Sequence, residues 1–343
     1  MKVLSVIVPA YNMEKWLGDC LASIAPGRSD PAYEVIVVND GSSDATSRIA
    51  HEWQALHPDV FRVIDKPNGQ YGSCVNEALK VATGTYVMIL DADDMFDASE
   101  FRKYLQALAT MASEASPPDV VVNDFEWIDV GGRRYRTTCY GLPPMFGMDA
   151  ILAVAGEISM HALAYRTGLL RDVGYRQTEG QCYTDIEWTT FPMASVRVGR
   201  SFPHVLYRYR TGRQGQSVEV ASYVRNMNQL ERMFESLARF RACRTENADK
   251  LQKAYVTEQV KRQALLVACI YFFEVPVRQA RLGFDAFFGK VEALSSEAFE
   301  AMENKCVFTW SPFPLRYLRL WRRHSFMRLP LMLMLRLYER LVF

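Results

Sequence analysis

Four short apolar runs in the first 90 residues each end in a polar segment. The runs cover residues 3–9, 33–38, 60–64 and 85–90. They are rich in valine and isoleucine, which is typical of buried strands. Between them the apolar residues recur at helical spacing, at 16–24, 49–56 and 75–82. This alternation predicts an α/β fold whose mostly parallel sheet is sandwiched by helices.

The polar segments share one position relative to the predicted strands, because each directly follows a strand. They are Ala10-Tyr11-Asn12, Asp40-Gly41-Ser42, Asn68-Gly69 and Asp91-Ala92-Asp93-Asp94. In a parallel sheet the carboxyl ends of the strands meet at one edge, where ligands bind. Each segment alone is an ordinary turn. Together they predict one crevice lined by polar side chains.

Three of the four residues in Asp91-Ala92-Asp93-Asp94 are acidic, and they follow a buried strand. Their carboxylates repel one another, so a cation is the expected partner. Hard oxygen ligands favour Mg²⁺ or Mn²⁺, which keep open positions for phosphate oxygens, so the expected substrate is a phosphate ester. The alternative is that Asp94 caps the next helix and the other two acids are solvated.

These motifs, in this order, resemble those of the family 2 glycosyltransferases. The resemblance includes Pro9-Ala10-Tyr11-Asn12, Asn39–Asp44, Asn68-Gly69 with Asn76, and Gly84-Thr85-Tyr86 leading to Asp91–Asp94, and it extends to about residue 125. It implies an inverting enzyme with the A-type nucleotide-sugar transferase fold, which is Rossmann-like. It also implies a nucleoside-diphosphate sugar as donor, most commonly a UDP-sugar.

Carried over by position, the resemblance implies a donor site at the ends of the predicted strands. Its residues are Pro9, Ala10, Tyr11, Glu14, Asp40, Asn68, Asn76, Asp91, Ala92, Asp93 and Arg210. Ala10 and Tyr11 would border the nucleobase. Asp40 would hydrogen-bond the base edge, and Glu14 would reach the ribose. The metal ligands would be Asp91 and Asp93, with Asp93 the better candidate for direct contact with a Mn²⁺ or Mg²⁺ cofactor and Asp91 nearer the sugar or ribose.

Inverting transfer needs a base that takes the proton of the acceptor hydroxyl as it attacks. The segment Glu179–Trp188 resembles the acidic motif of the family at the start of a helix. Thr184 replaces the customary Glu, and Asp185 falls where the general base of the family stands, so Asp185 is the predicted catalytic residue. The alternative is that Thr184 and Glu187 form a capping box and Asp185 complements the helix dipole. A helix N-terminus would also lower the pKa of Asp185.

Two later segments extend the resemblance. In Ser159–Leu170, His161 either contacts the diphosphate or sugar, or is a structural histidine with satisfied hydrogen bonds. The run 206–210 alternates as an exposed strand would and opens into a basic, glycine-punctuated loop at 211–217. The resemblance implies that Arg210 or Arg213 neutralises donor phosphate. Solvated surface arginines fit the same pattern.

The composition fits a globular enzyme and argues against a nucleic-acid or other polyanion partner. The 343 residues include 40 Lys and Arg and 39 Asp and Glu, a net charge of +1. Seven scattered cysteines without Cys-x-x-Cys spacing form neither a disulfide framework nor a zinc site, and they fit a reducing cytoplasm. The amino-terminal apolar run is too short for a signal peptide. A cytoplasmic location is therefore expected.

From residue 223 onward the pattern becomes helical. This predicts a catalytic domain at 1–222, a helical extension at 223–311 and a tail at 312–343. The tail carries seven arginines and one acid, a net charge of +6, among leucine, methionine and aromatic residues. Its longest uncharged run, 329–335, is too short to cross a bilayer. Arg316–Arg323 predicts one amphipathic segment, and Pro330 is expected to begin a second that contains Leu331–Leu335. Peripheral attachment of the tail to the anionic inner leaflet of the cell membrane is therefore expected. The alternative is packing on the catalytic domain or on a second copy.

The favoured function is transfer of one sugar to a hydroxyl of a glycan or lipid-linked acceptor in cell-surface polysaccharide synthesis. The chain lacks the Gln-x-x-Arg-Trp element of processive relatives, so the resemblance implies one addition per binding event. Two alternatives remain. Thr184 supports a non-catalytic glycan-binding or scaffolding relative. A sugar nucleotidyltransferase is opposed by the missing glycine-rich basic loop after the first strand.

Overall fold

The structure is a computed structural model of the chain, and it describes residues 2–25, 32–154, 158–213, 216, 219–245, 248–305 and 315–334. The chain forms two compact units, Met1–Gln216 and Ser217–Phe343. The predicted boundary at residue 222 lies inside α8 (Val220–Arg225) of the second unit. Every site residue predicted from the sequence belongs to the first unit, so the fold of that unit decides how these residues meet.

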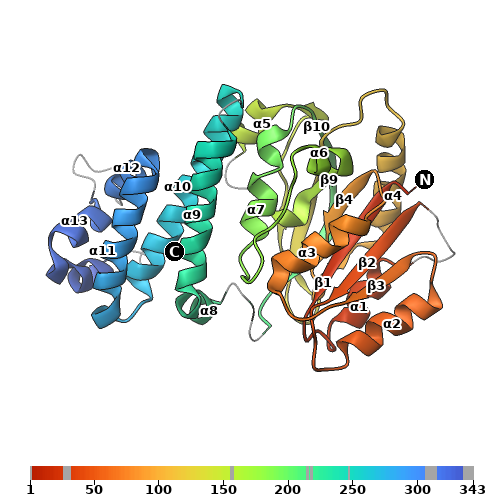
Figure 1. Ribbon diagram of the computed structural model, residues 1–343, viewed down its shortest axis with the longest axis horizontal. Helices are drawn as coiled ribbons and strands as arrows, with labels where there is room; N and C mark the ends of the chain where they lie inside the picture. Colours follow the sequence, from red (N-terminus) through yellow and green to blue (C-terminus); the bar gives the residue numbers. More distant parts are fainter. Residues whose placement is uncertain are drawn as a thin grey trace. The chain divides into compact units, whose positions relative to one another are not determined.

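The first unit is built on one sheet. Its strands lie in the order β3-β2-β1-β4-β9-β6-β10-β5, with β7 beside β6 and β8 beside β10 (Figure 1). In the described chain the strands are β1 (Leu4–Ala10), β2 (Tyr33–Asn39), β3 (Phe61–Asp65), β4 (Tyr86–Ile89), β5 (Met95–Phe96), β6 (Val120–Ile128), β7 (Arg134–Thr138), β8 (Met145–Phe146), β9 (Leu163–Arg166) and β10 (Gly199–Arg210). The four strands predicted from the apolar runs correspond to β1, β2, β3 and β4 and are confirmed.

The half of the sheet that carries the predicted motifs is parallel. β1 pairs with β2 and β4, and β2 pairs with β3, all in parallel register. Further along, β9 runs antiparallel to β4 and β6, whereas β6 and β10 are parallel. The sheet as a whole is mixed, and the expected parallel order holds for its first four strands. Every residue of β1 and β2 is buried, as continuous apolar runs predict for strands covered on both faces.

Helices fill the connections between the strands. Those in the described part of the first unit are α1 (Leu17–Ser23), α2 (Thr46–Leu56), α3 (Gln70–Val81), α4 (Ala98–Ala112), α5 (Met148–Ala153), α6 (Thr167–Asp172) and α7 (Asp185–Thr190), with the 3₁₀ turns η1 (Met160–Ala162) and η2 (Met193–Ser195). α2 packs on β2 and β3, α3 packs on β1 and β2, and α4 packs on β10. In Figure 1, α3 crosses the front of the sheet. The predicted α/β layering is confirmed.

The helix that follows the acidic cluster has its own cap. Asp97 precedes α4, and its side chain accepts hydrogen bonds from the backbone N–H groups of Ser99 and Glu100. The alternative in which Asp94 caps this helix is therefore wrong. Asp94 is only 1% exposed, so its carboxylate lies inside the protein and needs another explanation.

One buried carboxylate joins the amino ends of β1 and β2 to the turn before β4. Glu34 Oε1 accepts hydrogen bonds from Ser5 Oγ at 2.6 Å, Thr83 N at 2.7 Å and Thr83 Oγ1 at 2.8 Å. Lys2 Nζ lies 3.4 Å from Glu34 Oε2. Burial alone would raise the pKa of Glu34, but the hydrogen bonds outweigh it and lower the pKa below its ordinary value. A Cβ at Gly84 would lie 2.4 Å from the backbone nitrogen of Ser5, so the chain needs glycine there.

β10 differs from the exposed strand that its alternating sequence predicts. It lies between β6 and β5 in the sheet, and Leu206, Tyr207 and Arg210 are all buried. The alternation misleads because one of its polar residues, Arg210, is buried and another, Arg208, is only partly exposed. Arg208 Nε donates to Glu126 Oε1 at 2.6 Å, and the Arg210 guanidinium stacks on an aromatic ring. Arginine can be buried when its charge is paired or stacked in this way.

The second unit is helical. Its described helices are α8, α9 (Met227–Arg244), α10 (Lys250–Phe273), α11 (Val277–Leu294), α12 (Ser296–Asn304) and α13 (Tyr317–Arg323), with the 3₁₀ turn η3 (Ser325–Met327). α10 packs against α9, α11 and α12, so it forms the centre of the unit. The helical stretches predicted after residue 222 and from 251 to 273 correspond to α8, α9 and α10 and are confirmed.

The described part of the predicted tail packs on this helical unit. Leu318 and Trp321 of α13 are buried, and the Trp321 ring lies 4.2 Å from the ring centre of Phe284. Arg281 of α11 donates a hydrogen bond to the backbone carbonyl of Trp321 at 2.6 Å. The amphipathic segment predicted at Arg316–Arg323 is thus a helix, but its apolar side is buried within its own unit. The predicted tail residues 312–314 and 335–343 lie outside the described residues.

Among the described helices, none combines the length and the apolar character that a transmembrane segment needs. The described cysteines are free thiols.

Candidate active site

The carboxyl ends of β1 and β2 bring the first polar segments together. Asp40 N donates to Ala10 O at 2.9 Å, which joins the two strand ends. In the described chain the non-glycine residues with positive φ are Asn12, at 53°, in the segment after β1, and Gln70, at 66°, which begins α3 directly after Asn68-Gly69. Asn12 is held in place because its Oδ1 accepts a hydrogen bond from Ser43 N at 2.9 Å. Residues in this strained conformation are frequent at functional sites.

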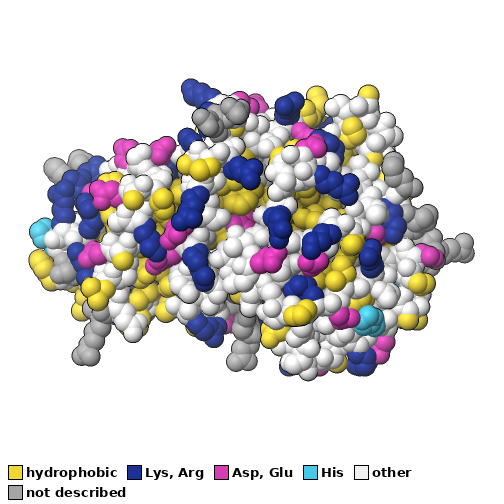
Figure 2. All heavy atoms as spheres, viewed as in Figure 1, with side chains coloured by type: hydrophobic (Ala, Val, Ile, Leu, Met, Phe, Trp, Pro, Cys, Tyr) yellow, Lys and Arg dark blue, Asp and Glu magenta, His cyan; other side chains and the backbone are white. Residues whose placement is uncertain are grey.

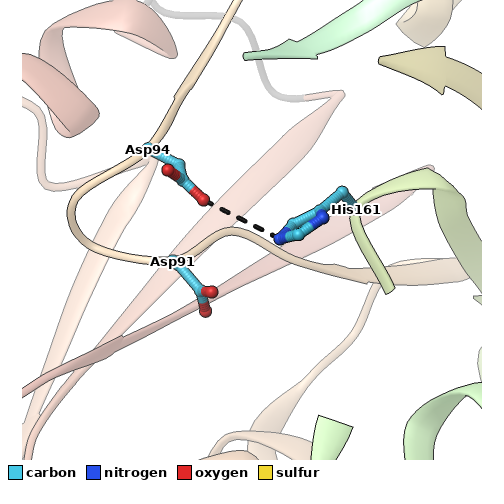
Figure 3. Close-up of side chains that lie close together, drawn as sticks. All are labelled: Asp91, Asp94 and His161. Carbon is cyan, nitrogen blue, oxygen red and sulfur yellow. Dashed lines mark ion pairs between the residues drawn. The ribbon is translucent and has the colours of Figure 1, made fainter. Parts of the chain in front are cut away.

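Asp91, Asp94 and His161 form a group of potential metal ligands, and their side chains converge in Figure 3. One ligand atom from each residue lies within 4.8 Å of those of the other two. His161 Nε2 is 4.0 Å from Asp94 Oδ2. The acids come from the loop after β4 and the histidine from η1, so the fold assembles the group from two distant segments.

The environment raises the pKa of both carboxyl groups in this cluster. For Asp91, loss of hydration and then repulsion from Asp93 raise the pKa to about 7. For Asp94, loss of hydration and then repulsion from Asp93 and Asp91 raise the pKa well above its ordinary value. Within the described residues, neither Asp91 nor Asp94 pairs with a lysine or arginine side chain. A bound cation would relieve this repulsion.

Two tyrosines that the sequence analysis did not single out hold the acidic cluster. Tyr207 Oη donates to Asp94 Oδ2 at 2.7 Å and accepts from Asp91 N at 3.1 Å. Tyr71 Oη donates to Asp91 Oδ1 at 2.6 Å. In the sequence these tyrosines stand out only by their positions. Tyr207 lies in the alternating run of β10, and Tyr71 closely follows Asn68-Gly69. Neither position identifies the carboxylate that the tyrosine contacts.

His161 is buried between aromatic rings. Its ring stacks on Tyr209 at 4.3 Å and lies 4.7 Å from the ring centre of Tyr207. Its Nδ1 is 2.8 Å from Ser159 Oγ, the satisfied hydrogen bond expected of a structural histidine. Burial lowers the pKa of His161 to about 3, so the imidazole is neutral near pH 7. A neutral imidazole with Nε2 toward a carboxylate is also a suitable metal ligand.

Asp93 forms an ion pair in this structure. Arg213 Nε donates a hydrogen bond to Asp93 Oδ2, and the side chains are 19% and 10% exposed, respectively. A cation bound directly by Asp93 would compete with this guanidinium. The predicted metal pair of Asp91 and Asp93 therefore stays a prediction, and the geometry adds Asp94 and His161 as candidate ligands.

Arg210 is buried at 3% exposure beside the same cluster. Its backbone N–H donates to Asp94 Oδ1 at 2.7 Å. Its guanidinium lies 4.5 Å from the ring centre of Trp16 and 3.7 Å from Asp19 Oδ2. Nε and Nη1 of Arg210 have no hydrogen-bond partner among the described residues. Buried donors without partners are costly, so an anionic ligand would be stabilised beside this side chain.

The predicted nucleobase side is organised around Asp40. Its Oδ1 accepts from Lys66 Nζ at 2.5 Å and from Gly69 N at 2.9 Å, and the carboxylate is almost fully buried. Asn68 Nδ2 donates to Asp40 O at 3.0 Å. Lys66 was not singled out from the sequence. These contacts fix the turn after β3 against the end of β2, and the role of Asp40 toward a base stays a prediction.

The other predicted donor residues on β1 and β4 differ in exposure. Tyr11 is 48% exposed, whereas Ala10 and Ala92 are buried at 2% and 1%. Pro9 and Ala10 are the last residues of β1. Glu14 Oε2 accepts from a backbone N–H just before α2 at 3.0 Å, so its carboxylate is already engaged. The contacts predicted with nucleobase and ribose are not tested by this geometry.

Asn76 fixes the loop that precedes α7. Its Nδ2 donates to Gln177 O at 2.9 Å and to Glu179 Oε1 at 2.9 Å, and its Oδ1 accepts from Gln177 N at 2.9 Å. Gly180 N donates to Gly69 O at 2.9 Å, which ties the same loop to the turn after β3. These contacts give Asn76 a structural role, and its predicted part in donor binding stays a prediction.

Asp185 begins α7, as the sequence predicts for the candidate base. The side chain is exposed to solvent. The surrounding protein nevertheless weakens hydration of the carboxylate, which raises the pKa of Asp185 despite hydrogen bonds from the helix N-terminus. The expected lowering by the helix is therefore wrong in its net direction. The charge of Asp185 contributes to the raised pKa of Asp91 and of Tyr71, which places all three groups within electrostatic range.

The predicted capping box is wrong. Thr184 is the N-cap of α7 but makes no side-chain capping bond. Glu187 is fully buried, and it accepts hydrogen bonds from Thr178 N and Thr178 Oγ1, both at 2.7 Å. Thr184 Oγ1 donates to Gln177 Oε1 at 3.0 Å. Both side chains hold the preceding loop because that loop folds back over the first turn of α7, a contact that spacing alone does not predict.

The chemistry of Asp91, Asp94 and His161 fits a divalent cation. Two carboxylates and a neutral imidazole are ligands that Mn²⁺ accepts, and the two acids share a buried site without a cationic side chain of their own in the described chain. His161 also has a hydrogen-bonded Nδ1, the usual support for a metal-binding ring.

Residues 5–172 match the family described as Glycosyl transferase family 2. The chain is 28% identical over 256 residues to the uncharacterized glycosyltransferase YibD of Escherichia coli, a match that covers 69% of this chain and 71% of YibD. It is 35% identical over 150 residues to the uncharacterized glycosyltransferase EpsJ of Bacillus subtilis, covering 44% and 40%. A chondroitin synthase of Escherichia coli is 32% identical over 135 residues, covering 36% and 19%. The last two matches span less than half of each relative.

Solved structures share the fold. TarS of S. aureus superposes with a TM-score of 0.64 at 20% identity, covering 94% of this chain and 53% of TarS. TarS 1-349 in complex with UDP gives a TM-score of 0.62 at 18% identity, covering 95% and 92%. Mannosyltransferase PcManGT from Pyrobaculum calidifontis, in complex with GDP-Man and Mn²⁺, gives 0.53 at 20% identity, covering 95% and 84%. The A-type nucleotide-sugar transferase fold with a helical C-terminal part is thus confirmed. The chain belongs to the family 2 glycosyltransferases.

Proposed function

We propose that this protein is an inverting, metal-dependent glycosyltransferase that moves one sugar from a UDP-sugar to a hydroxyl of a glycan or lipid-linked acceptor in polysaccharide synthesis. The observation that carries the proposal is the convergence of Asp91, Asp94 and His161 at the carboxyl edge of the sheet, with Asp185 in electrostatic range. Two comparisons support it. TarS 1-349 has been solved with UDP, and a chondroitin synthase is among the relatives.

The donor would lie along the ends of β1, β2 and β4. Tyr11 offers an exposed ring at the base side, and Asp40 is buried at the end of β2. On the diphosphate side, Arg210 has two guanidinium nitrogens without partners in the described chain, so it would donate to phosphate oxygens. Arg213 would also serve the diphosphate once it leaves Asp93.

Asp91, Asp94 and His161 would hold a Mn²⁺ or Mg²⁺ ion. A cation held there would supply positive charge to stabilise the negative charge that develops on the leaving nucleoside diphosphate. Tyr71 and Tyr207 keep the two carboxylates oriented through hydrogen bonds of 2.6 and 2.7 Å. The protein would thus fix the ligand atoms before any donor arrives.

Asp185 would accept the proton of the acceptor hydroxyl. Its raised pKa makes it a stronger base than an ordinary aspartate, and its exposure leaves it open to an acceptor from solution. Asn76 and Glu187 position it indirectly, because both fix the loop that leads into α7. Attack from the face opposite the diphosphate would invert the anomeric centre.

A non-catalytic relative that only binds glycans is the second candidate. Two observations favour it. Arg213 occupies Asp93, the predicted direct metal ligand, and Thr184 replaces the acidic residue customary before the base. It is the weaker candidate because Asp91, Asp94 and Asp185 all keep raised pKa values in one cluster, as a working site would require.

Release of nucleoside diphosphate from UDP-, dTDP- and GDP-sugars, with Mn²⁺ and with EDTA, tests the proposal. We expect Mn²⁺-dependent release from a UDP-sugar in the presence of cell-envelope glycans. Asp91→Asn should lose release, and Asp185→Asn should lose transfer but still bind UDP. Asp172→Asn, at an exposed acid on α6, is the matched control and should behave as the unaltered protein does. Glycan binding without any metal-dependent release would favour the non-catalytic relative.

A further inference from the structure

We propose that the second unit docks on an anionic lipid membrane through one exposed apolar face. This C-terminal apolar face consists of Phe326, Leu329, Leu333 and Met334, which are 73%, 52%, 53% and 36% exposed. The proposal goes beyond the proposed function, because it concerns where the protein binds and needs none of the catalytic chemistry.

The exposed residues lie on one side of a helical segment. Positions 326, 329 and 333 are three and four residues apart, the spacing that aligns side chains along a helix face. Residues 325–327 form η3, and the chain continues as helix from 328 to 334. Large apolar side chains that gather on a surface usually mark a contact with a partner or a membrane.

The other side of the same segment is anchored in the protein. Leu331 is 3% exposed. Arg328 is 4% exposed, and its guanidinium donates hydrogen bonds to the backbone carbonyls of Phe272 at 2.8 Å, Tyr271 at 3.0 Å and Val275 at 2.6 Å. One side of this helical segment is therefore attached to the unit, and the exposed apolar residues lie on the other side.

The sequence predicts two amphipathic segments in the tail, Arg316–Arg323 and a second that begins at Pro330. Leu318 and Trp321 of the first segment are buried inside the unit. Burial of the first amphipathic helix leaves the next turn, beginning at Phe326, with its apolar residues in solvent. Of the two predicted segments, the structure thus leaves the second, extended back to Phe326, as the one with exposed apolar side chains.

The net charge of the second unit indicates which partner binds the C-terminal apolar face. Residues 217–343 include 20 Lys and Arg and 13 Asp and Glu, a net charge of +7, whereas residues 1–216 carry −6. Arg316 and Arg323 are exposed and have no acidic partner in the described chain. In Figure 2, dark blue and yellow side chains lie next to one another at the end where Figure 1 labels α13. Apolar side chains flanked by cations suit an anionic bilayer.

The same charges oppose a second copy as occupant. A symmetric contact through this face would bring two units of charge +7 together, with Arg316 and Arg323 repeated on both sides. An anionic membrane would attract those charges and take up Phe326, Leu329 and Leu333 at the boundary between headgroups and acyl chains. An anionic membrane thus accounts for both the exposed apolar side chains and the positive charge.

Cosedimentation of the full chain with vesicles tests the proposal. One set of vesicles contains phosphatidylglycerol and phosphatidylcholine, and the other contains phosphatidylcholine alone. We expect binding to the anionic vesicles that weakens at high salt. The triple variant Phe326→Ser, Leu329→Ser and Leu333→Ser should bind them at least about tenfold more weakly. Arg316→Gln with Arg323→Gln should reduce binding to anionic vesicles by a smaller factor, because the apolar contact remains.

Leu56→Ser is the matched control, because Leu56 is 70% exposed on the first unit. It should bind as the unaltered protein does. All three positions of the triple variant are exposed, and its melting temperature and its release of nucleoside diphosphate without vesicles should not change. Failure of the unaltered protein to bind anionic vesicles, or equal binding by the triple variant, overturns the proposal. A dimer in light scattering that the triple variant abolishes, without vesicle binding, would assign the face to a second copy instead.

Discussion

Buried carboxylates lie at both ends of the parallel strands, and the protein treats them in opposite ways. At the amino ends, Glu34 is 5% exposed and accepts hydrogen bonds from Ser5 and Thr83, which outweigh burial and lower its pKa. At the carboxyl ends, Asp94 is 1% exposed and accepts hydrogen bonds too, yet burial and repulsion from Asp93 raise its pKa. Burial alone does not distinguish the two places.

The difference lies in what the neighbouring groups contribute. Glu34 has only donors and the Lys2 ammonium around it, so its charge is compensated by the fold. Asp91 and Asp94 repel each other and are repelled by Asp93, and within the described residues neither forms an ion pair with a lysine or arginine side chain. A buried carboxylate whose charge is balanced by hydrogen-bond donors and a cation stabilises the structure. Buried carboxylates whose charges are not balanced in this way indicate a binding site for a ligand. The following changes are chosen to break or sharpen this contrast.

Asp91→Asn should have the largest effect, a loss of activity without a loss of stability. It removes one charge but keeps the oxygen that accepts from Tyr71, so we expect metal-dependent release of nucleoside diphosphate to fall at least about 100-fold. The free energy of unfolding without metal should stay the same or rise, because repulsion is relieved. Activity assays and urea unfolding check the two parts. A clear loss of stability together with full activity would show that Asp91 stabilises the fold and does not belong to the ligand site.

Glu34→Ala should have the next largest effect, and on stability alone. It leaves Ser5 Oγ and Thr83 N without their acceptor, which we expect to lower the free energy of unfolding by about 1–3 kcal/mol. Glu34→Gln should cost less, because an amide oxygen can still accept. Urea unfolding measures both, with Glu77→Gln, at a partly exposed ion pair with Lys80 on α3, as control. Activity per folded molecule should be unchanged, and a selective loss of activity would show that the amino end takes part in catalysis.

The two ends should respond to pH with opposite sign. The pKa of Glu34 is lowered by folding, so its stabilising contribution is present above its unfolded pKa and is lost as pH falls through the folded value. The pKa of Asp91 is raised to about 7, so any stability from its extra proton is present at low pH and is lost as pH rises toward 7. Melting of Asp91→Asn against the unaltered protein from pH 4 to 8, without metal, measures the second part.

We expect Asp91→Asn to gain about 1 kcal/mol or more in relative stability across that interval, because one pKa unit corresponds to about 1.4 kcal/mol. Glu34→Gln should instead match the unaltered protein more closely as the medium becomes more acidic. Parallel curves for all three proteins would mean that neither carboxyl group has a shifted pKa.

Arg213→Gln should have the smallest effect. Arg213 neutralises Asp93 in this structure, so its removal should leave that carboxylate open and strengthen Mn²⁺ binding without donor by about two- to fivefold. Calorimetric titration with Mn²⁺ measures this, and Arg48→Gln, at an exposed ion pair on α2, is the control. Unchanged affinity would show that Asp93 takes no part in the metal site. UDP binding should weaken in the same variant if Arg213 also serves the diphosphate.

The sequence predicted the parts of the site that depend on strand ends. The segments after β1, β2 and β4 lie at one edge of the sheet because the carboxyl ends of parallel strands all point to that edge. The strands themselves can be recognised in the sequence from their apolar runs. The start of α7 at Asp185 was predicted correctly as well. These features depend on local sequence and on sheet topology, both of which can be deduced from one chain.

Contacts between distant segments were not predictable in the same way. The pairing of Arg213 with Asp93, the hydrogen bonds of Tyr71 and Tyr207 to the acids and the bond from Thr178 to Glu187 all join residues whose separation depends on loop geometry. The capping box predicted for Thr184 and Glu187 does not form for this reason, because the loop before α7 makes hydrogen bonds with the same two side chains. Which side of the tail faces solvent could not be predicted either, because it depends on how α13 packs on the rest of its unit.

Anomalous diffraction at the manganese edge, from crystals grown with Mn²⁺ and UDP, tests the central claim most directly. The account predicts a manganese peak between the carboxylates of Asp91 and Asp94 and Nε2 of His161, in contact with the diphosphate of UDP. Bound UDP without a manganese peak at these side chains, with Arg213 still on Asp93, would contradict it.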